Sequence, residues 1–144
     1  MKEIKIPHIG MTFARDFMPQ IGPDFVHNLK SRNVPHRLEN VKPHTLKASQ
    51  SEFNHEKVRQ MMHVPSKSEK PVVVSNDDHI LDGHHRWLAD YNKSPKKSMK
   101  VLRVDLPILD LIHLTRSFKT TKHKSVVESI RIIVKESRNL QRHK

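Results

Sequence analysis

The sequence predicts a compact α/β or α+β domain, with a small mixed sheet and flanking helices. Short apolar or β-branched segments of strand length alternate along the chain with segments of helical periodicity. The chain has 144 residues and 35% hydrophobic content, which suffices for one modest core and leaves no room for a second catalytic domain. No segment approaches the roughly 18 apolar residues of a membrane span.

The sequence of residues 2–41 predicts two strands and one helix. Residues 2–6, KEIKI, predict a short edge strand. Pro23 begins a predicted helix that extends to Asn33, because proline suits a first helical turn. Residues 36–41, HRLENV, predict a strand, and residues 42–53 predict either a functional loop or a simple connection.

The helix expected over residues 55–63 has the best-defined beginning in the chain. Asn54 precedes it as an N-cap, and Phe53 and Val58 have the spacing of a hydrophobic staple. These signals predict that the helix holds the preceding loop in place.

The second part of the chain predicts a hairpin, a strand and further helices. Residues 70–75 and 79–82 are short apolar runs joined by the turn composition NDD, which is typical of a hairpin. Residues 99–105 predict another strand, and residues 107–116 predict a helix that opens on proline. Residues 124–137 predict an amphipathic helix, either docked on the core or self-associating as a homodimer contact.

The end of the chain is strongly basic. The formal net charge is +12, and residues 113–144 carry nine lysines and arginines against two acidic residues, hence +7. Such an excess favours DNA or another polyanion as a partner, because lysine and arginine contacts to phosphates release counterions. The alternative is a solvated tail that only aids solubility. The candidate nucleic-acid contacts are Lys122, Lys124, Arg131 and Lys135.

Composition excludes several classes of chemistry. The chain has no cysteine, so disulfides, thiolate zinc sites and cysteine nucleophiles are excluded. It contains no GxGxxG or Walker A loop. Residues 1–10 have no apolar core of signal-peptide length, so we expect a cytoplasmic protein without a membrane partner.

The stretch DGHHR, Asp82 to Arg86, predicts an anion site where a strand becomes a helix. If Trp87, Leu88 and Tyr91 bury one side of that helix, Gly83 lies near its N-cap and the next three residues form its first turn. Backbone N–H groups point out of such a turn, and the helix dipole favours an anion there.

Each residue type in this stretch suits phosphate. Gly83 lets a phosphate approach, and Arg86 can hold it with a planar fork. His84 and His85 add donors or proton-transfer groups, and Asp82 could orient a histidine or hold hydrated Mg²⁺. The alternative is that Asp82 only caps the helix and the histidines are ordinary surface residues.

The stretches LKASQSEFNHEKVRQM, KPVVVSNDDH and ILDGHHRWLA resemble the ParB/sulfiredoxin-like superfamily, in the small ParB-like form seen in phage genomes. The resemblance covers about residues 36–116. It leaves residues 1–35 as an N-terminal extension of unknown role and residues 117–144 as a basic helix or tail. It also implies the host cytoplasm if the chain is phage-encoded.

The superfamily includes CTP-binding partition proteins, sulfiredoxin, nucleotide-dependent serine kinases and ParB-like nucleases, all of which handle phosphate at the corresponding box. Sulfiredoxin has its reactive cysteine where this chain has His84, so sulfinic-acid repair is excluded. Partition proteins carry glutamate-arginine-arginine where this chain has His84 to Arg86, which argues against CTP specificity and a partition clamp. The kinases are most similar, with an Asp-Gly-x-His-Arg form.

The kinase resemblance also implies an acidic base in the first box. Glu52 is the nearest candidate, although Gln50 could occupy that position, and a glutamine cannot act as a base. The alternative for Glu52 is a solvated carboxylate before a helix.

Three function classes follow from these observations. The first is a nucleotide-binding phosphotransferase or NTPase that uses Mg²⁺ with ATP, ADP or CTP, with Glu52 as base and residues 82–86 on the phosphates. The second is a DNA nuclease in which His84 or His85 activates water. The third is a DNA-binding module without turnover.

Overall fold

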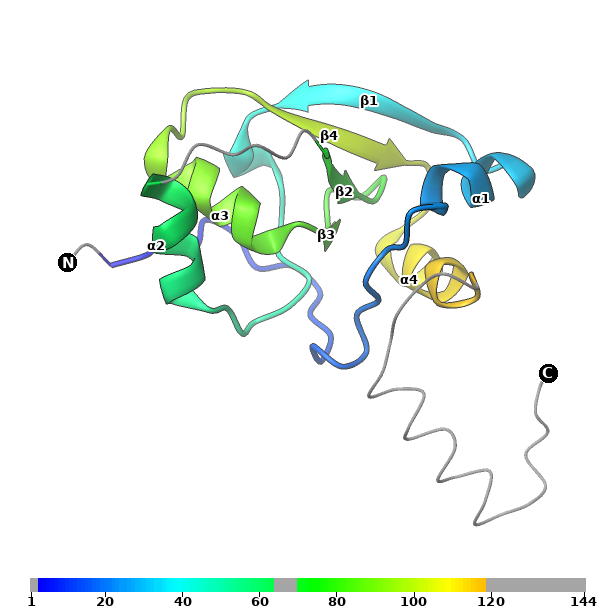
Figure 1. The fold of residues 1–144 in the computed structure, drawn as a ribbon, viewed down its shortest axis with the longest axis horizontal. Coiled ribbons are helices and arrows are strands. Elements are labelled where there is room, and N and C mark those ends of the chain that lie inside the picture. Colours follow the sequence, from blue (N-terminus) through cyan, green and yellow to red (C-terminus); the bar gives the residue numbers. More distant parts are fainter. Residues whose placement is uncertain (1–2, 64–69, 119–144) are drawn as a thin grey trace, which may run out of the picture.

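The computed structural model describes residues 3–63 and 70–118. Within these ranges the fold is α+β, with four α-helices and a four-stranded mixed sheet, and the predicted class is confirmed (Figure 1). The helices are α1 (Phe25–Ser31), α2 (His55–His63), α3 (His84–Lys93) and α4 (Ile108–Arg116), with a short 3-10 helix at Pro43–Thr45. The strands are β1 (His36–Val41), β2 (Val72–Val74), β3 (Ile80–Asp82) and β4 (Met99–Val104).

The sheet has the order β1-β4-β2-β3. β4 pairs antiparallel with β1 and parallel with β2, while β2 and β3 form the predicted antiparallel hairpin. All three residues of β2 are buried, as expected for a central strand that is covered on both faces.

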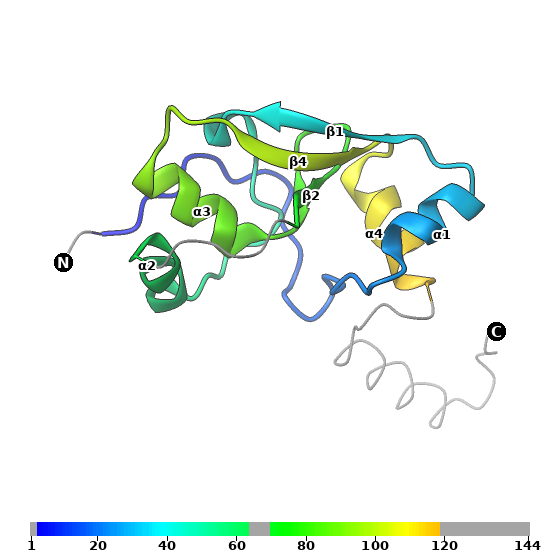
Figure 2. The same cartoon turned by 45° about the horizontal axis from the view of Figure 1, so that its top comes forward.

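Helices pack on both faces of the sheet (Figure 2). Alternate residues of β2 and β4 belong to two different core clusters, as expected for side chains that point to opposite faces. One core cluster combines β2 and β4 residues with α2 and α3. Its largest member is Trp87, fully buried, whose indole Nε1 donates to the Pro43 carbonyl at 2.7 Å. The other cluster combines the opposite faces of the same strands with α1 and α4.

Residues before the expected domain boundary at position 36 belong to both cores. Ile4 joins the cluster around Trp87, and Phe25 and Leu29 join the cluster around α4. The predicted strand at residues 2–6 is wrong, because residues 3–8 form no strand there. Asn92 on α3 instead bonds both backbone groups of Lys5, which pairs this extended segment with a helix rather than with the sheet.

The loop between the 3-10 helix and α2 covers the outer side of β3. Lys47 bonds the hairpin backbone on one side, with its N–H to Asp78 and its carbonyl to Ile80. Ala48 bonds the N-terminal segment on the other, accepting from the Gly10 N–H at 2.9 Å. Residues 42–53 therefore do more than connect two elements, since they protect one edge of the sheet.

The predicted start of α2 is confirmed. The Asn54 side-chain oxygen accepts the Lys57 N–H at 3.0 Å, and Phe53 packs on the core cluster that contains Val58. The burial expected along α3 holds for Trp87 and Leu88, whereas Tyr91 is only partly buried. None of the described helices is long and apolar enough to cross a membrane.

Candidate functional site

The DGHHR stretch lies where β3 becomes α3, as the sequence predicts. Gly83 is the N-cap of α3 and has φ +102°, a backbone conformation that favours glycine. A Cβ at this position would approach Val72 Cγ2 to 3.0 Å. The tight turn and the packing against β2 therefore suffice to explain the glycine. The predicted role of Gly83 in making room for a phosphate stays a prediction.

Replacing Gly83 by alanine should destabilise the fold by about 1–3 kcal/mol, because a side chain is strained at this φ and Val72 must move. Chemical denaturation measures this cost. Gly83→Ala should cost less stability in a Val72→Ala chain than in the wild type. The smaller side chain at position 72 removes the close contact with the new Cβ. A Gly83→Ala chain as stable as the wild type would contradict the strained turn.

The first turn of α3 consists of His84, His85 and Arg86. The N-cap makes no side-chain hydrogen bond to this turn, and the helical bonding begins with the Trp87 N–H donating to the Gly83 carbonyl at 3.0 Å. Within the described ranges, the first N–H groups of α3 thus have no side-chain cap. Uncapped N–H groups at the positive end of a helix dipole favour an anionic ligand.

His84 is buried and accepts hydrogen bonds from the preceding loop. Its Nε2 accepts the Ser49 backbone N–H at 3.0 Å and lies 3.3 Å from the Ser49 hydroxyl oxygen. Burial, with His85 nearby, lowers the pKa of His84 to about 3. The ring is therefore neutral at pH 7, and because Nε2 is an acceptor its proton is on Nδ1.

His85 has the same role one residue later. Its Nε2 accepts the Asn54 backbone N–H at 3.0 Å, directly before α2. Partial burial lowers the pKa of His85, and the charges of Lys57, Arg15 and His55 lower it further. The Phe53 ring lies beside both imidazoles, with centroids 6.0 Å from His84 and 6.3 Å from His85.

The two histidines thus attach the loop of residues 49–54 to the start of α3. Each Nε2 lone pair is occupied by a backbone N–H, so neither imidazole can take a proton at that atom while the loop is bound. This arrangement weighs against a general-base role for the two Nε2 atoms, and the predicted catalytic role of His84 and His85 stays a prediction. Their Nδ1–H groups remain donors.

Arg86 is partly buried, and its guanidinium donates to the Lys70 carbonyl beside β2. One arm of the expected fork thus already has a partner. Burial raises the pKa of Asp90, one turn along α3, and the positive charge of Arg86 acts in the opposite direction. The contact with Lys70 places the guanidinium near the start of the hairpin.

Asp82 ends β3 with a partly buried side chain. Burial raises the pKa of its carboxyl group, although the charges of Lys70 and Lys57 act in the opposite direction. Among the described residues, no group of three or more histidine, aspartate or glutamate side chains gathers as a metal site. Asp82 could still supply one ligand to Mg²⁺, which usually binds through one or two carboxylates together with substrate phosphates.

Several cations surround the start of α3. The charge of Lys57 acts on both Asp82 and His85, that of Lys70 acts on Asp82 and that of Arg15 acts on His85. Arg86 adds a fourth positive charge from the first turn itself. The uncapped turn therefore lies among four positive charges, three of which come from segments outside α3.

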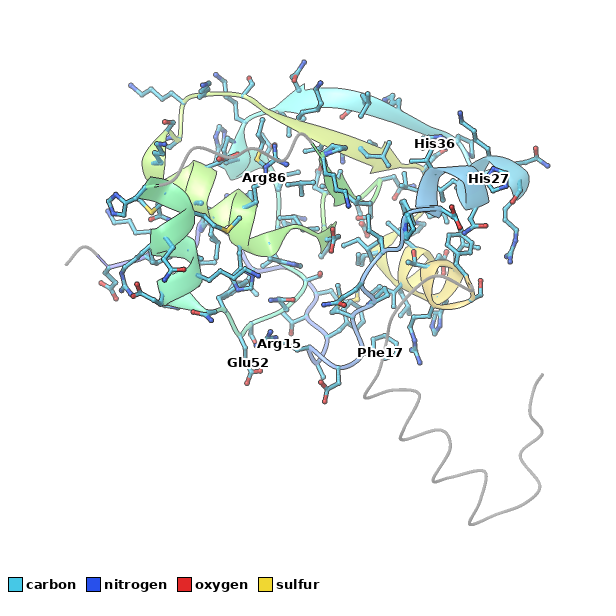
Figure 3. All side chains as sticks on the ribbon, viewed as in Figure 1. Arg15, Phe17, His27, His36, Glu52 and Arg86 are labelled. Atoms are coloured by element: carbon cyan, nitrogen blue, oxygen red, sulfur yellow. The ribbon has the colours of Figure 1, made fainter. Side chains whose placement is uncertain are left out.

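The expected base does not face this turn. Glu52 is exposed and lies apart from Arg86, with its side chain pointing away from the body of the protein (Figure 3). Gln50, the alternative residue for the same position, is buried and donates its side-chain amide to the Glu52 carbonyl at 2.9 Å. A base at Glu52 would need its carboxylate to face the DGHHR helix, and in this structure the side chain points elsewhere.

Sequence reasoning missed the partners of the two histidines. Ser49 and Asn54 contribute backbone N–H groups, which carry no sequence signature, and each lies more than 30 residues before its histidine. Arg15 and Lys57 were also missed as sources of positive charge, although the net charge of +12 indicated an excess of cations.

The nucleic-acid contacts predicted for the tail lie outside the described residues, as does the predicted amphipathic helix at residues 124–137. These residues are Lys122, Lys124, Arg131 and Lys135. No family model, curated protein or solved structure matches this chain.

Proposed function

We propose that the start of α3 binds the phosphate groups of a nucleotide, and that the chain is a nucleotide-dependent phosphotransferase or NTPase of the ParB/sulfiredoxin-like type. One observation carries the proposal: the uncapped first turn of α3 is surrounded by the positive charges of Arg15, Lys57, Lys70 and Arg86. An anion with several oxygens suits both the row of N–H donors and the field.

Phosphoryl transfer depends mainly on positioning and charge stabilisation, which this turn can supply. The backbone N–H groups of the first turn would hold phosphate oxygens, and the free arm of Arg86 would neutralise their charge. The Nδ1–H groups of the two neutral histidines are further donors in the same turn. Bound Mg²⁺ would neutralise phosphate charge, with Asp82 as its protein ligand.

A binding module without turnover is the second candidate. Both histidine Nε2 atoms accept backbone N–H groups and Glu52 points away, so none of the three predicted catalytic residues offers a proton acceptor at this turn, which supports binding without turnover. A nuclease that uses a histidine base needs such an acceptor as well, and we rank it below the other two. In the binding module, the same turn would hold a backbone phosphate of DNA.

Replacing Arg86 by lysine should weaken nucleotide binding about tenfold, because lysine keeps the charge and loses the planar fork. A thermal-shift screen of the wild type with ATP, ADP, CTP and GTP in the presence of Mg²⁺ identifies the nucleotide. A ligand at 100 times its dissociation constant adds about 2.7 kcal/mol to native stability. Titration of that nucleotide then gives both dissociation constants.

Arg32→Lys is the matched control, since Arg32 follows α1 on another part of the molecule and its guanidinium lies over Phe118. Lys57→Glu should also weaken binding, while Lys30→Glu, with the same change in net charge, should not. Equal losses in each pair would mean that only the overall charge matters. No shift with any nucleotide, together with DNA binding that is weakened by Lys57→Glu, would favour the second candidate.

A further inference from the structure

The two edges of the sheet differ in what covers them. The outer side of β3 is covered by residues 47–49, which are in turn bonded to the N-terminal segment. β1 is the opposite edge and pairs with β4 alone among the described strands. Figure 1 shows no described segment along its outer side. An open strand edge carries unpaired N–H and C=O groups that can bond another strand.

The β1–β4 register determines which residues carry those groups. The Asp105 N–H donates to the Pro35 carbonyl at 2.9 Å, and Pro35 lies opposite Asp105 at the end of the ladder. In an antiparallel pair, hydrogen-bonded and non-hydrogen-bonded positions alternate. The backbone groups of Arg37 and Glu39 therefore face β4, and those of His36, Leu38 and Asn40 face outward.

Leu38 is at the centre of this edge and is unusually exposed. Its exposed fraction is 61%, the largest among the exposed large hydrophobic residues of the described chain. Its partner on β4, Leu102, is only 6% exposed. A leucine in the middle of an open strand differs from the usual protection of such edges by lysine, proline or a bulge.

We infer that β1 pairs antiparallel with β1 of a second copy of this chain, with the two-fold axis at Leu38. In this register Leu38 lies opposite Leu38 of the other copy, and His36 lies opposite Asn40. Each of these three residues exchanges its N–H and C=O with the residue opposite. The two sheets then join into one, and both leucines lose solvent exposure at the junction.

The charges on β1 favour this register over its neighbours. With the axis at Leu38, Arg37 lies opposite Glu39 in both halves, at non-hydrogen-bonded positions where side chains are closest. An axis at Arg37 would place two arginines opposite each other, and an axis at Glu39 would place two glutamates opposite each other. Glu39 already pairs with two arginines of its own chain, with 3.0 Å from Arg103 Nε to Glu39 Oε1 and 2.5 Å from Arg37 Nε to Glu39 Oε2. Both arginines lower the pKa of Glu39, and in the dimer the two Arg37–Glu39 pairs of the two copies would form one alternating cluster of charges.

Sedimentation velocity of the full chain over a dilution series tests the pairing. We expect a monomer–dimer equilibrium in the wild type. Leu38→Lys should weaken the dimer at least about tenfold, because it places two ammonium groups at the axis. Leu109→Lys, on the exposed side of α4, is the matched control and should leave the equilibrium unchanged. Arg37→Glu should weaken the dimer as well, with Arg32→Glu as its control.

Cross-linking locates the contact, since the chain has no native cysteine. Leu38→Cys should form an intermolecular disulfide on oxidation, because opposed residues in such a pair have Cα atoms about 5.5 Å apart, within the range of a disulfide. Leu109→Cys should not. Circular dichroism and thermal melting must show that each variant keeps its fold. If Leu38→Lys does not fold, Arg37→Glu provides a second test.

A wild-type chain that stays monomeric at every concentration would overturn the inference. So would a dimer that both Leu38→Lys and Arg37→Glu leave intact, since the contact would then lie elsewhere, for instance in residues 119–144. The inference is independent of the phosphate site, because none of the tested β1 residues contributes to the start of α3.

Discussion

Lowering the pH from about 6 to about 3 should destabilise this fold by about 1.4 kcal/mol for each pH unit, through His84 alone. The pKa of His84 is lowered from 6.5 to about 3, because the ring is buried and lies close to His85. Between about pH 6.5 and about pH 3 the total loss of stability reaches about 5 kcal/mol, a large part of the stability of a small domain.

The sign follows from proton binding in the two states. Between about pH 6.5 and pH 3 the unfolded chain binds a proton at His84 and the folded chain does not. Protonation therefore favours the unfolded state, and stability falls as the pH falls through this window. The pKa of His85 is also lowered, so its contribution has the same sign.

Urea denaturation at a series of pH values measures the slope. The chain has a single tryptophan, and the ring of Trp87 lies 6.4 Å from that of His84, so indole fluorescence reports on this part of the core. His84→Gln keeps an acceptor and removes the titration, so the slope of this variant should be shallower by the His84 contribution. His27→Gln, at an exposed position on α1, should keep the wild-type slope.

Identical slopes in the wild type and His84→Gln would contradict the buried, neutral ring. The outcome also bears on chemistry at the site. A histidine that stays neutral down to low pH while its Nε2 is occupied cannot shuttle protons near pH 7. The contribution of His84 is then to hold residues 49–54 against α3, and the proposed phosphate chemistry would depend on the backbone donors, Arg86 and the surrounding cations.

The helices and strands of the domain could be predicted because their signals are local. Pro107 precedes α4, Asn54 caps α2, and the NDD turn joins the hairpin, each within a few residues of the element that it defines. The segment at residues 2–6 was misassigned because alternating charge and isoleucine resembles an edge strand. Its backbone groups bond Asn92, a partner that periodicity cannot indicate.

The start of α3 could be located from the sequence, whereas the roles of its side chains could not. A glycine followed by polar residues and then by Trp87 predicts a strand-to-helix turn and a buried helix face, and both are present. The roles of His84 and His85 depend on backbone N–H groups brought close by folding. Any residue type donates such a bond, so its partner leaves no trace in the sequence.

Trp87→Ala should cost about 3–5 kcal/mol of stability, because it truncates the largest fully buried side chain of the described core. The indole also donates to the Pro43 carbonyl at 2.7 Å, and so ties α3 to the 3-10 helix after β1. Trp87→Phe keeps most of the apolar volume and loses this bond, so we expect a smaller loss of about 1–3 kcal/mol. Leu109→Ala, at an exposed position on α4, is the control and should change stability by less than about 0.5 kcal/mol.

Thermal and urea denaturation, followed by circular dichroism, give the stability of the three variants. Circular dichroism is used because two of them lack the single tryptophan, the native fluorophore. The comparison separates two contributions, since Trp87→Ala removes packing and the hydrogen bond while Trp87→Phe mainly removes the bond. If Trp87→Ala were as stable as the wild type, the side of α3 that faces the sheet would be assigned wrongly. His84 and Arg86 would then be oriented wrongly as well, because they are placed by the same helix. A large loss in Trp87→Ala with a small one in Trp87→Phe would instead support the helix orientation on which the proposed phosphate site depends.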